Sequence, residues 1–101
     1  MNQDQRKQLE SSVVQLYKRA RQKYGALKAL TAYMGKHVAH QISLKHDAAA
    51  QKRIDERIRT GFAVELSSDD HLERADARLR GLVREGDAEL EIPFAKEKTD
   101  A

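Results

Sequence analysis

The strongest constraint on the fold is a helical repeat of apolar residues within the first 24 positions. Between Gln3 and Tyr24 apolar side chains recur every three or four residues, and polar residues fill the gaps. The repeating positions are Leu9, Val13, Leu16, Tyr17, Ala20 and Tyr24. This spacing places them on one face of an α-helix, where they can be buried. The pattern predicts a long amphipathic first helix that ends at Gly25.

Two shorter helical patterns lie on either side of Gly35. Good helix-forming residues and apolar spacing predict helices over residues 26–34 and 36–45. In the second of these, Val38 and Ile42 are one helical turn apart and share an apolar face that Ala39 and Leu44 widen, and we expect this face in the core. Gly35 permits the positive φ that ends a helix without a steric penalty.

The second half of the chain predicts two further helices. Asp47 is a suitable N-cap for a helix over residues 48–60, in which Asp55 and Glu56 mix with basic residues on a solvated face. Ser68 or Asp69 should cap the last helix, over residues 71–85. Its apolar face fits either the core or a dimer seam, and consists of Leu72, Ala75, Leu79, Leu82 and Val83.

Two segments alternate apolar and polar residues, as strands do. Residues 62–66 and 88–94 show this period of two. Pro93 has no N–H to donate to a neighbouring strand, so the second segment is expected at a sheet edge. The two segments could pair with each other, or the second could pair with its copy across a two-fold axis.

These patterns predict a mainly α fold. We expect four or five helices, a helix-turn-helix at about residues 26–46, and at most one short two-stranded β element. A chain of 101 residues has the size of one domain, which we place at residues 1–95, with residues 96–101 as a flexible tail.

Composition excludes several classes of protein. There is no cysteine, so disulfide scaffolds and cysteine-based zinc sites are excluded. The start of the chain is polar and no apolar run reaches membrane-spanning length, so we expect a cytoplasmic protein. Neither a glycine-rich phosphate loop nor a nucleophile spaced from a base is present. We therefore expect no enzymatic activity and no cofactor.

Histidines concentrate near the middle of the chain. His37 and His40 are spaced to share one helix face, but among nearby residues only Asp47 could complete a metal site, so none is expected. Histidines gain positive charge as the pH falls toward 6. If this region binds DNA, binding should tighten between pH 8 and pH 6.

Positive charge is concentrated in the N-terminal half. Residues 1–46 contain nine Lys or Arg and two acidic residues, a net charge of +7, whereas residues 87–101 contain two and five, a net charge of −3. The segment of residues 36–45 contains no carboxylate, which would repel a phosphate backbone. This asymmetry favours a polyanionic partner.

The segment around Gly35 resembles the helix-turn-helix of Cro-type phage repressors and prophage regulators. The similarity rests on Leu30-Thr31-Ala32-Tyr33-Met34-Gly35 followed by Gln41-Ile42-Ser43. The family usually has Ala where Thr31 stands, and an apolar residue where Lys36 follows the glycine. The resemblance implies a sequence-specific DNA-binding transcriptional regulator, a homodimer on a palindromic operator.

By the same resemblance, the helix over residues 36–45 would enter the major groove. The residues expected to face bases are His40, Gln41, Ser43 and Lys45. Those expected to contact phosphates are Arg19, Arg21, Lys28 and Lys36.

Two alternatives remain open at this stage. The chain could be a small helical protein-binding module, such as an inhibitor or an antitoxin-like partner. It would act through the basic first helix or through the edge strand of residues 88–94. The unusual turn at residues 35–37 favours this alternative. The chain could also bind nucleic acid non-specifically, through charge alone.

Overall fold

The structure is a computed structural model that describes residues 1–100, with side chains described for residues 1–85. Over this part, the chain forms six α-helices and no strand, so the predicted mainly α class is confirmed with one helix more than expected. The helices are α1 (Gln3–Tyr24), α2 (Ala26–Met34), α3 (Lys36–Gln41), α4 (Ala48–Arg59), α5 (Phe62–Leu66) and α6 (Asp69–Asp100).

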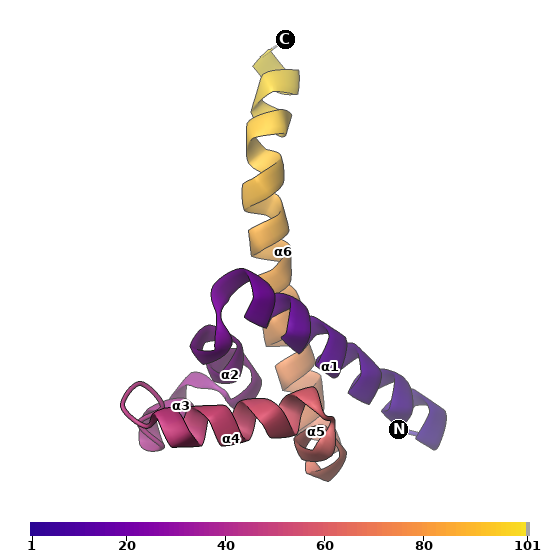
Figure 1. The fold of residues 1–101 in the computed structure, drawn as a ribbon. Helices are drawn as coiled ribbons and strands as arrows, with labels where there is room; N and C mark the ends of the chain where they lie inside the picture. The colour runs from indigo at the N-terminus through magenta and orange to yellow at the C-terminus, as the bar shows by residue number, and fades with distance from the viewer. Residues whose placement is uncertain (101) are drawn as a thin grey trace.

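The core forms where α1 crosses α6 and α2 packs against both (Figure 1). The apolar stripe of α1 is buried as predicted, with Val13 and Tyr17 at 0% exposure. The face of α6 that could have been a dimer seam is also buried within the chain, since Leu72 and Leu79 are at 0% exposure. This face therefore belongs to the core.

Both predicted N-caps in the second half of the chain are confirmed. Asp47 Oδ1 accepts a hydrogen bond from the Ala50 N–H at 2.9 Å, at the start of α4. Ser68 Oγ accepts from the His71 N–H at 3.1 Å, at the start of α6. Each side chain satisfies an N–H that has no partner within its helix.

The prediction of a strand over residues 62–66 is wrong, because this segment is the short helix α5. Gly61, with φ of 85°, ends α4 and starts α5. Of the alternating apolar residues only Val64 is buried, whereas Phe62 and Leu66 are 51% and 72% exposed. The alternation therefore does not mark one buried face.

The predicted edge strand over residues 88–94 is also wrong, because its backbone lies within α6. Leu90 and Phe94 are four residues apart, a spacing as compatible with a helix as their alternation is with a strand. The predicted division between a domain of residues 1–95 and a tail of residues 96–101 stays a prediction, and residue 101 lies outside the described residues. None of the described helices has the length and apolar character needed to cross a membrane.

Candidate functional site

The α2–α3 pair is joined by one residue, Gly35, as the sequence predicted. Its φ of 93° lies in the region that favours glycine. Arg78 of α6 holds the end of α2 in place, donating from Nε to the carbonyl of Ala32 at 2.6 Å and from Nη2 to that of Tyr33 at 3.1 Å. These carbonyls have no partner within the helix, so Arg78 fixes the point at which the chain turns into α3.

The second helix of the pair ends four residues before its predicted end. After Gln41 the chain forms a Schellman motif: the Ser43 N–H donates to the carbonyl of His40 at 3.0 Å, and the Leu44 N–H donates to that of Ala39 at 3.3 Å. Ser43 occupies the left-handed position of this motif, with φ of 55°. Ser43 and Lys45 therefore lie beyond α3 rather than on it.

The structure buries two of the four residues of the apolar face that the sequence predicted for this helix. Ala39 is its buried residue, and Leu44, just beyond its end, is 2% exposed. Val38 and Ile42 were expected in the core but are 40% and 39% exposed. The Schellman motif explains the difference, because it usually brings the residue after the left-handed position into apolar contact with the last helical turn.

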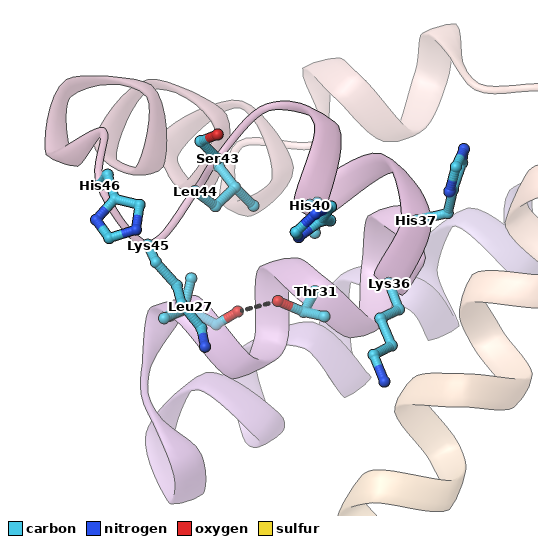
Figure 2. A pocket seen from close by; sticks show the side chains of 10 residues that line it. Leu27, Thr31, Lys36, His37, His40, Ser43, Leu44, Lys45 and His46 are labelled. Atoms are coloured by element: carbon cyan, nitrogen blue, oxygen red, sulfur yellow. Dashed lines mark hydrogen bonds between the residues drawn. The ribbon is translucent and has the colours of Figure 1, made fainter.

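A groove of about 920 Å³ lies between α2, α3 and the turn that follows α3 (Figure 2). Its lining residues include five lysines or histidines and no carboxylate. The lining consists of Leu27, Thr31, Lys36, His37, Ala39, His40, Ser43, Leu44, Lys45 and His46.

The basic side chains are spread along the whole groove. Figure 2 shows Lys45 and His46 at one end, Lys36 and His37 at the other, and His40 between them. All five are exposed. An anionic chain lying along the groove would therefore meet positive or protonatable groups over its full length.

The structure brings four of the eight predicted site residues together in this groove: Lys36, His40, Ser43 and Lys45. Gln41 is exposed on α3 but does not line the groove. Sequence reasoning did not include His37 and His46 among the DNA contacts. Their proximity to Lys36 and Lys45 in the chain is the signal that could have found them.

Three predicted phosphate contacts lie on α1 and α2, outside the groove lining. Arg19 is exposed on α1, and the ammonium of Lys28 lies 4.5 Å from the ring centroid of Tyr24. Arg21 donates from Nε to the Asp55 carboxylate at 2.8 Å. Asp55 is 4% exposed, so its predicted place on a solvated face is wrong, and Arg21 neutralises a buried charge.

The three groove histidines do not form a metal site. Within the part of the chain whose side chains are described, no three His, Cys, Asp or Glu residues are grouped so that they could hold a metal ion. Their contribution to the groove is hydrogen bonding and, when they are protonated, positive charge.

Comparison of the chain with models of protein families, with curated proteins and with solved structures found no match. Any function assigned to the groove must therefore be argued from the residues that form it.

Proposed function

We propose that this chain is a sequence-specific DNA-binding regulator that contacts double-stranded DNA through α3 and the rim of the adjacent groove. The observation that carries the proposal is the charge of the groove, which has five lysine or histidine side chains and no carboxylate in its lining. Nucleic-acid affinity arises mainly from such groups facing phosphates, and a nearby carboxylate would oppose it.

The residues of the site are suited to different contacts with DNA, according to where they lie. Lys36 and Lys45, at opposite ends of the groove, are suited to two phosphates of one strand. His40 and Gln41 are exposed on α3 and can offer hydrogen bonds to base edges. Ser43 shapes the end of α3 through its backbone conformation. Arg19 and Lys28 are both exposed and are kept in the proposal as outer phosphate contacts, whereas Arg21 binds the buried carboxylate of Asp55.

A helix of six residues can reach only a few base pairs. A homodimer on a palindromic operator would double the contacts and thereby supply the affinity that one α3 lacks. Dimerisation is part of the proposal for this reason.

The proposal is tested by a gel shift on a random-sequence duplex pool at several salt concentrations, with Lys36→Gln and Lys45→Gln. Each lysine that contacts one phosphate should lower the slope of log affinity against log salt by about 0.9 per protomer. Lys7→Gln is the matched control, since Lys7 is exposed near the start of α1, which lies at the opposite end of the body from α3 (Figure 1). Equal slopes for all three variants and the parent would contradict the proposal.

A protein-binding function is the second candidate. Two large apolar residues one turn apart on α5, Phe62 and Leu66, are 51% and 72% exposed. Exposed apolar side chains in a cluster are typical of protein–protein contacts. If the parent chain fails to bind DNA at low salt, α5 is the surface to mutate in a search for a protein partner.

A further inference from the structure

The short helix α5 has an apolar face that the fold leaves uncovered. This α5 face consists of Phe62 and Leu66, which are 51% and 72% exposed and lie one helical turn apart. Val64, on the opposite side of the helix, is 1% exposed and packs into the core. Water therefore contacts two neighbouring large apolar side chains, an arrangement typical of a surface that a second protein covers.

The two ends of the α5 face carry opposite charges. At the Phe62 end, the guanidinium carbon of Arg57 lies 5.7 Å from the centre of the Phe62 ring. At the Leu66 end, Glu65 is exposed and lies three residues after Phe62, so it borders the same face. Within the described side chains, neither Arg57 nor Glu65 takes part in an ion pair.

The carboxylates that come next in the chain are already paired. Asp69 lies 2.5 Å from Arg6, and Asp70 lies 2.7 Å from Arg74. Glu65 is therefore the carboxylate at this end of α5 that a partner can use.

An apolar centre between a cation and a carboxylate is complementary to a second copy of itself turned around. When two α5 helices meet in antiparallel orientation, Phe62 of each copy faces Leu66 of the other, and Arg57 of each lies toward Glu65 of the other. A contact of this kind has two-fold symmetry and is complete with two copies. The charges therefore favour a second copy of this chain over a partner that carries a single sign of charge.

We propose that two copies of this chain form a dimer through antiparallel α5 helices. Each copy contributes two large apolar side chains, and interfaces this small are typical of weak complexes. The dimer therefore dissociates readily in the absence of DNA. Two half-sites on one duplex would bring the copies together.

The position of α5 also suits the spacing of an operator, a point that rests on the proposed function. The 12 residues of α4 span about 18 Å and separate α5 from the turn that follows α3 (Figure 1). Two copies that meet at α5 can therefore place their α3 helices up to about 36 Å apart. Half-sites one turn of DNA apart are separated by roughly 34–36 Å.

Sedimentation equilibrium of the full chain without DNA, up to about 1 mM protein, tests the interface. We expect the parent to show a monomer–dimer equilibrium. Leu66→Ser should raise the dissociation constant of the dimer about tenfold, because two-fold symmetry removes the apolar side chain from both copies. Val38→Ser is the matched control, since Val38 is 40% exposed on α3 and its loss should leave the dissociation constant unchanged.

Two charge reversals test the antiparallel arrangement. Arg57→Glu and Glu65→Arg should each weaken dimerisation about tenfold, because like charges then meet at both ends of the interface. An equimolar mixture of the two variants should restore dimerisation, since a dimer with one copy of each pairs an arginine with a glutamate at both ends. Lys18→Glu is the control for charge reversal, since Lys18 is exposed on α1, and it should have no effect.

Three results would overturn the inference. A parent chain that stays monomeric at about 1 mM would leave the α5 face for a different protein. Equal dissociation constants for Leu66→Ser and Val38→Ser would place the dimer contact elsewhere. A mixture of the charge variants that dimerises no better than either variant alone would exclude the antiparallel arrangement. Failure of DNA binding is a separate result, since none of these measurements contains DNA.

Discussion

Tyr17 donates its hydroxyl hydrogen to the carboxylate of Asp55, with 2.5 Å between the two oxygen atoms. Asp55 also accepts from Arg21 and Arg59, at 2.8 Å and 2.9 Å. Burial and, next, the hydrogen bond to Asp55 raise the pKa of Tyr17 above its ordinary value, so the hydroxyl remains a donor at neutral pH. This cluster joins α1 to α4 and holds the α4 side of the fold against the first helix.

Replacing Asp55 should destabilise the fold strongly. Asp55→Ala removes the acceptor of a fully buried tyrosine and leaves two arginines without their shared carboxylate, which should cost about 3–5 kcal/mol. Asp70→Ala is the control, because Asp70 pairs with Arg74 at the surface and should cost no more than about 1 kcal/mol. Urea denaturation measures both, and similar losses for the two variants would contradict a special role for Asp55.

Ser43→Gly should stabilise the protein. Ser43 adopts φ of 55°, which costs a residue with a side chain roughly 1–2 kcal/mol, and glycine avoids this cost at the expense of greater freedom in the unfolded chain. We expect a net gain of about 0.5–1 kcal/mol in the free energy of unfolding. His40→Gly, within α3, should instead lose about 1 kcal/mol. A loss with Ser43→Gly would show that α3 does not end in the Schellman motif.

Stability should decrease as the pH falls below the ordinary range of histidine, because of His71. Its ring packs edge-on against Tyr33, with centroids 5.1 Å apart. Burial, then the charges of Arg78 and Arg74, lower the pKa of His71 in the folded state. The unfolded chain, with a histidine pKa near 6.5, takes up the proton first as the pH falls. The stability that the fold gains from neutral His71 is therefore fully present above about pH 6.5 and is lost as the pH falls below this value.

The urea midpoint at several pH values between 7.5 and 5 measures this effect. His71→Gln should flatten the pH dependence, whereas His37→Gln, on exposed α3, serves as the control for removing a histidine. An unchanged pH profile in His71→Gln would rule out the coupling.

Arg6 should be more important to the fold than its place on a polar helix face suggests. It donates to the carbonyl of Ser67 at 2.6 Å and to that of Val64 at 3.1 Å, and its Nη1 lies 2.5 Å from Asp69 Oδ1. Arg6→Ala should lower the free energy of unfolding by about 2 kcal/mol, because the carbonyls at the end of α5 lose their charged hydrogen-bond donor. Arg6→Lys should recover less than half of the lost stability, since one ammonium cannot replace the planar set of donors of a guanidinium.

The neighbouring variant Lys7→Ala provides the baseline for Arg6. Lys7 is exposed, and its loss should change the free energy of unfolding by no more than about 0.5 kcal/mol. Full rescue by Arg6→Lys would indicate that charge alone matters at this position.

The elements that the sequence predicted well are those determined by nearby residues. The first helix is defined by its own apolar stripe and glycine end, and the caps at Asp47 and Ser68 bond to residues three positions away. By contrast, which residues of α3 are buried depends on how α3 packs against α2. Of the four apolar residues expected to share its core face, Ala39 and Leu44 are buried, whereas Val38 and Ile42 are 40% and 39% exposed.

In the candidate site, too, contacts between residues close in the chain were easier to predict than contacts between distant residues. Lys36, His40, Ser43 and Lys45 line the same groove because they are close in the chain. The pairing of Arg21 depends on Asp55, 34 residues away, which no local pattern reveals. One signal was present: Tyr17 lies on the apolar stripe, and a buried tyrosine hydroxyl needs a hydrogen-bond partner. The sequence could thus predict that a partner exists, but not which residue it is.

Selection of bound sequences from a random duplex pool tests the central claim most directly. If α3 reads bases, the parent chain should recover a palindromic consensus, and Gln41→Ala should bind with less discrimination between that consensus and random duplexes. Lys36→Gln should weaken binding evenly across sequences. Failure of the parent to retain any duplex at low salt would contradict the account, and retention without a consensus would contradict base reading by α3.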